Sequence, residues 1–237
     1  MPGKKPFVSV IIPTLNEEKY IRYPLDGLRW QTFRDFEIIV VDSYSTDRTR
    51  DIALKHAKVI ERPKRGMSNA RNNGARIAKG SILIFIDADT MPERETLKAY
   101  VSAFEDRNIV AATGPMRPLE RATPFIRLSY LLLSVYLSRL LSAFGRLSIS
   151  GSNFAVRRDA FENAGGFDEK LVTNESHSLS RKLRKYGRVS YVDGARVRTS
   201  VRRITRWGLF RYLVFRLWNN LGYALMGNAA KEYEQIR

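Results

Sequence analysis

Two aspartates stand one residue apart at the end of the segment GSILIFIDADT, residues 80–90. Residues 82–86 are apolar and largely β-branched, which is typical of a strand buried on both faces. Asp87 and Asp89 would offer hard oxygen ligands at its rigid end, and such ligands suit Mg²⁺ or Mn²⁺ shared with a substrate phosphate. The alternative is a plain turn into the next helix, because aspartate is also a common turn residue.

The elements that must position these carboxylates follow an alternating pattern. Short apolar runs alternate with helix-like segments, which predicts an α/β fold with a mostly parallel sheet and helices on both faces. Ligands of such sheets bind at the carboxyl ends of the strands. Asp42 and Asp87 each close an apolar run, so we expect both at one edge. The expected strands are 7–12, 36–41, 59–60 and 82–86, and the expected helices are 17–30, 46–57, 68–78 and 93–104.

Composition and turn chemistry exclude several classes of protein. A chain of 237 residues that is 44% hydrophobic can bury one large core, so disorder is excluded as its main state. It has no cysteine and only two histidines, which argues against a zinc centre and leaves oxygen to bind any metal. The first strand-to-helix turn, residues 13–17, lacks the glycines of a dinucleotide-binding fold, and no phosphate-loop motif is present.

Positive charge is concentrated toward the C-terminus. The net charge is +17, and residues 181–237 hold 14 lysines or arginines against three acidic residues. Such a segment favours an anionic partner: nucleic acid, phospholipid or a phosphorylated substrate. Its aromatic and basic residues mix at helical spacing, which predicts a helix in a bilayer interface, with a core helix bearing a solvated basic face as the alternative. The residues concerned are Arg206, Trp207, Phe210, Arg211, Tyr212, Phe215, Arg216 and Trp218.

A second apolar segment, PFIRLSYLLLSVYLSRLLSAFGR, occupies residues 124–146. Its central run, 128–137, is too short to cross about 30 Å of hydrocarbon, and Arg127 and Arg139 interrupt the longer stretch. We expect an in-plane membrane helix, with a buried core helix as the alternative. The N-terminus lacks the apolar region of a cleaved signal, so we expect a cytoplasmic protein, peripheral on the inner face of the cell membrane.

Four motifs, taken in order, resemble the family 2 inverting glycosyltransferases of GT-A fold. They are IIPTLNEE, VVDSYSTDRT, KRGMSNARNNGARIAKGSILIFIDADT and SGSNFAVRRDAFENAGGFDE. The resemblance implies a Rossmann-like GT-A domain over residues 1–203, followed by a basic, aromatic helical segment over 204–237. It also implies an enzyme of the hexosyltransferase type, which uses Mg²⁺ or Mn²⁺ to move a sugar from a UDP- or GDP-linked donor to a lipid-linked or saccharide acceptor.

The same resemblance assigns roles to individual residues. Asp87-Ala88-Asp89 resembles the DXD motif, in which Asp89 would hold the divalent cation and Asp87 would contact ribose or metal. Arg71 could stabilise the leaving diphosphate, with a surface helix arginine as the alternative. Asp42 resembles the residue that binds the nucleobase. The implied nucleotide-sugar site consists of Pro13, Thr14, Glu17, Asp42, Arg71, Asp87, Ala88 and Asp89, although Glu17 could equally be a first-turn helix acid.

Two further segments resemble the parts of the family that face the donor sugar and the acceptor. Ser150, Gly151, Ser152 and Asn153 resemble the loop that faces both. Arg203, Arg206 and Trp207 resemble the Q/RXXRW motif, which implies a place on the acceptor side.

The departure from the family pattern lies at the catalytic base. A Glu-Asp pair is expected after the GGFDE stretch, but here Glu175 is followed by Ser176. Serine is not a base at neutral pH, so Glu175 or His177 would have to act, or the acceptor would be an already ionised phosphate. These residues could also simply begin a helix.

A protein that keeps the fold without turnover, or a basic nucleic-acid-binding protein, is the competing function. The strand-end aspartates would repel a nucleic-acid backbone, and no nucleic-acid motif accompanies the basic tail, so the sequence favours the enzyme.

Overall fold

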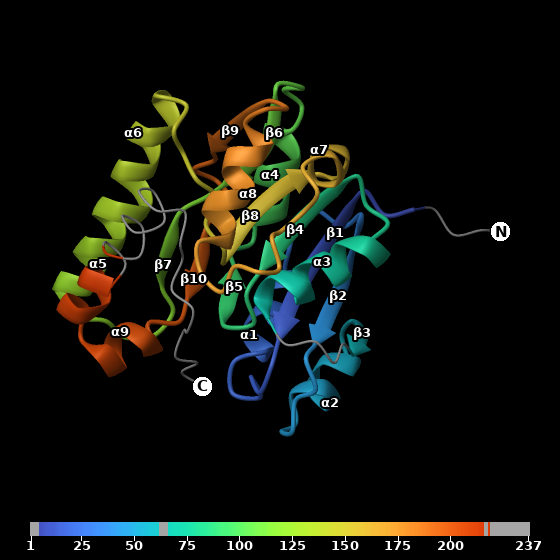
Figure 1. Ribbon diagram of the computed structural model, residues 1–237. Coiled ribbons are helices and arrows are strands. Elements are labelled where there is room, and N and C mark those ends of the chain that lie inside the picture. Colours follow the sequence, from blue (N-terminus) through green and yellow to red (C-terminus); the bar gives the residue numbers. More distant parts are fainter. Residues whose placement is uncertain (1–4, 62–65, 216–217, 219–237) are drawn as a thin grey trace.

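A seven-stranded sheet forms the centre of the computed structural model, which describes residues 5–61, 66–215 and 218 (Figure 1). The strand order is β3-β2-β1-β4-β8-β6-β9. β8 runs antiparallel to both of its neighbours, and the other paired strands are parallel. The predicted mostly parallel sheet is therefore confirmed. The strands are β1 (Val8–Thr14), β2 (Phe36–Asp42), β3 (Lys58–Glu61), β4 (Ile82–Ile86), β6 (Ile109–Thr113), β8 (Asn153–Arg157) and β9 (Arg188–Tyr191).

Helices cover both faces of this sheet, because successive strand side chains point to opposite faces. Ile11 and Phe85 belong to a buried cluster that includes side chains of α3, α7 and α8. Val10 and Ile84 belong to a second cluster, with side chains of α1, α2 and α4. The helices are α1 (Arg22–Arg29), α2 (Thr49–Leu54), α3 (Met67–Ile77), α4 (Thr96–Ala103), α7 (Arg158–Asn163) and α8 (Glu175–Leu183).

The predicted elements occur in the predicted order, and the largest difference is at the start of the first helix. We expected a helix from residue 17, but α1 begins at Arg22. Asn16 has a left-handed backbone, with φ of 53°, and its side-chain oxygen accepts a 2.8 Å bond from the Thr46 backbone N–H. The segment before α1 is thus tied to the turn after β2, which delays the start of the helix.

A small second sheet, which the sequence did not predict, joins the middle of the chain to its C-terminal part. Its order is β5 (Thr90–Pro92), β10 (Val197–Thr199), β7 (Met116–Pro118). The Ser200 N–H donates to the Asp89 carbonyl at 3.1 Å. Helix α9 (Arg202–Trp207) therefore starts next to the predicted DXD segment.

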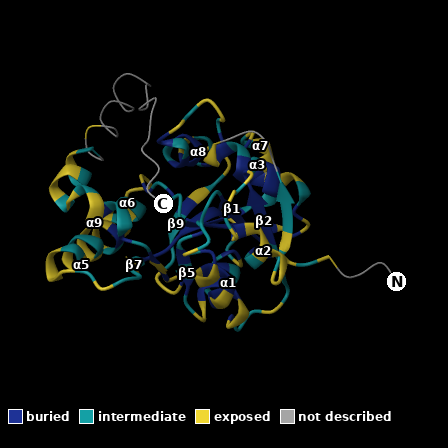
Figure 2. Cartoon of the chain, turned by 90° about the horizontal axis from the view of Figure 1, so that it is seen from below, coloured by how far each residue is buried: buried dark blue, intermediate teal, exposed yellow. Residues whose placement is uncertain are grey.

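The apolar segment forms one continuous helix at the edge of the molecule, made of α5 (Pro124–Tyr130), the π-helical η1 (Leu131–Leu137) and α6 (Ser138–Ala143). It lies beyond β7, on the same side as α9 (Figures 1 and 2). Ser134 is its buried residue, and the Ser134 hydroxyl accepts a bond from the Met116 N–H. The alternative of a buried core helix is therefore wrong.

This helix has 20 residues. It is therefore longer than the apolar run 128–137, from which we expected a helix lying in the plane of the membrane. Among the described residues, Pro124–Ala143 is the one helix long and apolar enough to cross a membrane, by length and composition alone. Its exposed large side chains include Phe125, Leu132, Tyr136 and Leu140.

The C-terminal helical segment is described only in part. Gly208 follows α9 with φ of 80°, and residues 209–215 are helical. The Trp207 and Phe215 rings pack edge to face with centroids 5.4 Å apart, while Phe210 and Trp218 are exposed. The predicted domain boundary after residue 203 falls inside α9. Arg216 and residues 219–237 of the predicted interfacial segment lie outside the described residues.

Candidate active site

Several of the predicted site residues meet where β1, β2 and β4 end. Thr14 pairs with Asp42 at the last register position of β1 and β2, and Asp87 follows β4 directly. Because β8 is antiparallel to β4, its first residue pairs with Ile86 and the preceding loop reaches the same edge. The edge therefore combines residues from both halves of the chain.

Arg71 lies at the centre of this edge and is fully buried, so the alternative of a surface arginine is wrong. Its guanidinium donates to the Asp87 carboxylate at 2.8 Å, to the Glu175 carboxylate at 3.0 Å and to the Gly151 carbonyl at 2.8 Å. It also lies 5.3 Å from the centre of the Phe167 ring. Burial alone would lower the pKa of Arg71, but the two carboxylates outweigh it and raise that pKa, so the side chain stays charged.

The loop before β8, which includes Gly151 and Ser152, packs against Arg71 and Asp87. The Ser152 hydroxyl donates to the second oxygen of Asp87 at 2.7 Å. A Cβ on Gly151 would lie 3.1 Å from the Ser176 hydroxyl and 3.3 Å from the Arg71 guanidinium, so a larger residue would crowd both groups. Both Asp87 oxygens are thus held by protein donors.

Asp89 lies in a second cluster, with Glu17 and Arg202. Arg202 makes two bonds to the Glu17 carboxylate, at 2.8 and 2.6 Å, and its guanidinium is 3.2 Å from Asp89 Oδ2. Burial raises the pKa of Asp89 to about 7, with Asp87 and Glu17 acting in the same direction and Arg202 against it. The sequence analysis did not identify Arg202. It lies in a segment rich in arginine, and no motif or spacing distinguishes it from the others there.

A divalent cation fits Asp89 better than Asp87. No group of three or more His, Asp or Glu side chains that could hold a metal occurs among the described residues. Mg²⁺, however, commonly uses only one or two carboxylates and completes its shell with water and substrate phosphates. Apart from Arg202 at Oδ2, the Asp89 carboxylate receives from the described residues only a long 3.4 Å contact, from the Thr90 hydroxyl to Oδ1. Its other oxygen could therefore accept a metal.

The predicted nucleoside end of the site is formed by Asp42, Pro13 and Thr14. Asp42 accepts bonds from the Ser45 N–H at 2.9 Å and the Ser45 hydroxyl at 2.6 Å, so it shapes its own turn. Pro13 is buried within β1 and pairs with Val41. Within the described part of the chain, the buried Thr14 hydroxyl makes no hydrogen bond, which fits a group that a ligand would satisfy.

The helix that begins at the predicted base position is α8. Asn174 precedes it in a left-handed conformation, and the Ser176 hydroxyl is 3.5 Å from the same Glu175 oxygen that accepts from Arg71. One oxygen of the Glu175 carboxylate is therefore engaged by the Arg71 guanidinium. His177, the other candidate base, is half-buried on α8. The structure thus brings Glu175 and Ser176 into the Arg71 cluster.

Other predicted residues lie elsewhere. The Asn153 side chain is bonded to the Tyr100 hydroxyl and the Ala195 carbonyl inside the core, so it anchors β8. The Ser150 hydroxyl points to the Met116 sulfur at 3.2 Å. The remaining predicted residues, Arg203, Arg206 and Trp207, are on α9.

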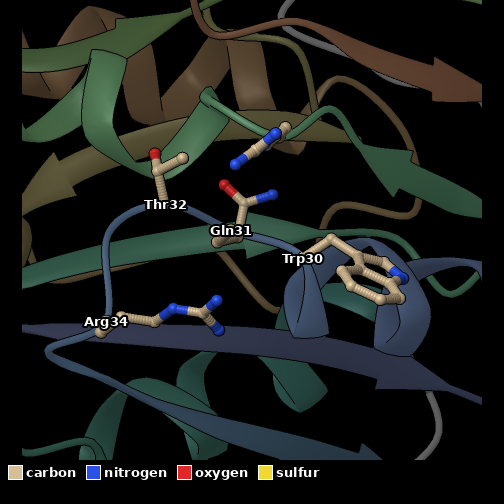
Figure 3. A pocket seen from close by; sticks show the side chains of 5 residues that line it. Trp30, Gln31, Thr32 and Arg34 are labelled. Carbon is tan, nitrogen blue, oxygen red and sulfur yellow. The ribbon is translucent and has the colours of Figure 1, made fainter.

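A separate hollow of about 550 Å³ lies beside the C-terminal end of α1 (Figure 3). Its lining shares no residue with the clusters above and consists of Trp30, Gln31, Thr32, Arg34 and Arg94. The Gln31 side chain is fully engaged with backbone groups of the neighbouring segments. Its bonds join α1 to the start of α4, which gives the glutamine a structural role.

Comparison with known sequences identifies relatives. The model of the family described as "Glycosyl transferase family 2" matches residues 9–165. The chain is 30% identical over 195 residues to probable glycosyltransferase YdaM of Bacillus subtilis, covering 74% of this chain and 46% of that protein. It is 28% identical over 191 residues to glycosyltransferase AglE of Haloferax volcanii, covering 73% of this chain and 60% of that protein. The chain thus spans about half the length of these relatives.

Solved structures confirm the GT-A fold. The mannosyltransferase PcManGT from Pyrobaculum calidifontis, solved with GDP-Man and Mn²⁺, is 26% identical with a TM-score of 0.68, covering 97% of this chain and 67% of that one. TarS from S. aureus is 26% identical with a TM-score of 0.64, covering 95% of this chain and 40% of that one. The fold, the ordered motifs and the match over residues 9–165 together show that the chain belongs to the family 2 glycosyltransferases.

Proposed function

We propose that this chain transfers a sugar, with inversion at the anomeric carbon, from a nucleotide-diphosphate sugar to an acceptor at a membrane surface. One observation carries the proposal: Arg71 and Ser152 hold both oxygens of Asp87 at the strand edge, while Asp89 beside them keeps an oxygen available. The relatives support a nucleotide-sugar donor, since PcManGT was solved with GDP-Man and Mn²⁺ and TarS with UDP-GlcNAc.

In this proposal the two clusters serve different parts of the donor. Asp89 would hold the cation, with Asp87 as its neighbour, and a bound Mg²⁺ or Mn²⁺ would neutralise charge on the leaving diphosphate. Arg71 offsets the charges of Asp87 and Glu175, so that a diphosphate can approach an edge that would otherwise repel it. The Thr14 hydroxyl, which makes no hydrogen bond to the described residues, would accept or donate a bond at the nucleoside end.

We further propose that the acceptor oxygen is ionised before it attacks, as in a phosphate carried by a lipid. Transfer to a neutral saccharide hydroxyl requires a base near the attacking oxygen. Glu175 is paired with Arg71, and its neighbour is a serine. A phosphate acceptor removes the need for a base, which accounts for Ser176 at this position.

The membrane part of the proposal rests on the exposed helix Pro124–Ala143. It presents a row of large apolar side chains to solvent, and the aromatic residues Phe210 and Trp218 are exposed in the segment after α9. Arginines accompany both, as at Arg127 and Arg211. An apolar face flanked by cations suits a bilayer with anionic lipid, and we place the chain on the inner face of the cell membrane.

Calorimetric titration tests the donor and the cation together. UDP- and GDP-sugars are titrated into the wild type, Asp89→Asn and the control Asp26→Asn, an exposed carboxylate on α1, each with and without Mn²⁺. We expect at least one nucleotide sugar to bind in a Mn²⁺-dependent way to the wild type and to the control. Asp89→Asn should bind it at least about tenfold more weakly. Unchanged Mn²⁺ dependence in Asp89→Asn would contradict the site, and no binding of any nucleotide sugar would favour the competing non-enzymatic functions.

A further inference from the structure

Arg202 forms the densest set of charged contacts near Asp89. It makes a bidentate pair with Glu17, contacts Asp89 Oδ2 at 3.2 Å, and its guanidinium carbon lies 4.5 Å from the centre of the Tyr20 ring. The three charged side chains are largely shielded from water, with 13% to 19% of each exposed. A positive charge of the protein itself therefore lies against the carboxylate to which we assign the divalent cation.

The guanidinium and a divalent cation would compete for the same carboxylate. Mg²⁺ binds carboxylate oxygens at about 2.0–2.1 Å, so a metal on Asp89 would lie within a few ångströms of the Arg202 nitrogen. Two positive charges at that separation, partly shielded from water, repel each other strongly. Metal can bind Asp89 well only when Arg202 gives up this contact or gains another anion.

We propose that Arg202 acts as an internal counter-cation that excludes divalent metal from Asp89 until the donor diphosphate arrives. This rests on Asp89 as the cation site of the proposed function. The planar guanidinium fork that now binds Glu17 also matches phosphate oxygens, so a diphosphate provides the anion that allows Arg202 and the metal to coexist. Metal and donor then load together, and metal alone binds weakly.

The position of Arg202 in the chain favours a local movement. It is the first residue of α9, and the preceding residues are held by Glu120, which accepts from the Ser200 hydroxyl at 2.6 Å and from the Val201 N–H at 2.9 Å. The backbone at this point is therefore anchored. The side chain can shift from Asp89 toward a bound phosphate without displacing the small sheet.

The test measures Mn²⁺ binding to the full chain without nucleotide, by electron paramagnetic resonance of free Mn²⁺. Arg202→Met should bind Mn²⁺ at least about tenfold more tightly than the wild type, and Arg202→Lys should fall between them. The matched control is Arg198→Met. Arg198 lies exposed on the neighbouring strand β10 and pairs with Glu93. It should leave Mn²⁺ affinity unchanged. Adding Asp89→Asn to Arg202→Met should abolish the increase in Mn²⁺ affinity.

The outcomes separate this proposal from the proposed function. Equal Mn²⁺ affinity in the wild type and Arg202→Met, lost in both with Asp89→Asn, would overturn the role of Arg202 and leave the cation site standing. No Mn²⁺ binding in any variant, with or without UDP and GDP, would overturn both. Where circular dichroism shows that Arg202→Met is unfolded, Arg202→Gln replaces it, because glutamine removes the charge and keeps hydrogen-bonding capacity toward both carboxylates.

Discussion

The raised pKa of Asp89 predicts an unusual pH dependence of stability. The pKa rises from its ordinary value of 3.8 to about 7 on folding, mainly through burial. A carboxyl group with a raised pKa binds its proton more tightly in the folded chain than in the unfolded chain. Its contribution to stability is fully present below pH 3.8 and is lost as the pH rises through 7. The folded protein therefore loses stability from this group between mildly acidic and neutral pH.

The magnitude follows from the two pKa values. Linkage between them gives a loss of about 2 to 3 kcal/mol from pH 5 to pH 8.5. Asp89→Asn cannot ionise, so it lacks this loss. The free energy of unfolding of Asp89→Asn minus that of the wild type should therefore increase by about that amount over this range. Other titrating groups are common to both proteins and largely cancel in the difference.

Urea unfolding in the presence of a chelator, at half-unit steps from pH 5 to pH 8.5, measures this difference. Asp26→Asn serves as the control, because Asp26 is exposed on α1, and its difference from the wild type should stay flat. A flat difference for Asp89→Asn as well would refute the reasoning. It would mean that the cluster with Glu17 and Arg202 does not hold Asp89 in a proton-binding environment.

Three further changes test the remaining parts of the site and the surface. Arg71→Met should cost about 3 to 5 kcal/mol in urea unfolding, because it leaves two partly buried carboxylates unpaired, and a cost below 1 kcal/mol would contradict the central role of Arg71. Ser176→Asp should speed transfer to hydroxyl acceptors by about 10²- to 10⁴-fold in a product assay while leaving phosphate acceptors unaffected; equal effects on both would contradict the proposed acceptor. The pair Leu132→Asp and Leu140→Asp should weaken co-sedimentation with anionic liposomes at least about a hundredfold, at about 1.5 kcal/mol or more per leucine, whereas Leu54→Asp, on α2, should not; unchanged sedimentation of the pair would contradict the membrane proposal.

The first four strands of the large sheet, β1 to β4, could be predicted because their apolar, often β-branched runs carry a local signal, whereas β6, β8 and β9 were not predicted. The runs ending at Asp42 and before Asp87 became β2 and β4 almost unchanged. The small sheet could not be found in the same way, since strands of three residues are too short to show an alternating pattern. The antiparallel direction of β8 likewise depends on which strands it lies between.

Site residues that belong to one sequence motif could be predicted. Contacts between segments far apart in the sequence could not. Asp87 and Asp89 stand at the end of one strand. The burial of Arg71, by contrast, depends on Glu175, 104 positions away, and on Gly151, 80 positions away. The motif made Arg71 a candidate, but its burial and its distant partners could not be inferred from the local sequence. Arg202 could not be identified for the same reason, because its partners lie near the start of the chain and in its middle.

The pairing of Glu17 with Arg202 has a consequence for folding while the protein is synthesised on the ribosome. The two residues are 185 positions apart, so at about 5–20 residues per second roughly 10 to 40 s separate their synthesis. β1, β2 and β4 can assemble during that interval, before Arg202 has been synthesised. The sheet edge that carries Glu17 and Asp89 then lacks this arginine. Glu17 and Asp89 lack this counter-charge in the nascent chain until α9 emerges. A chain interrupted before residue 202 would therefore form much of the sheet and lack the charge balance of the finished site.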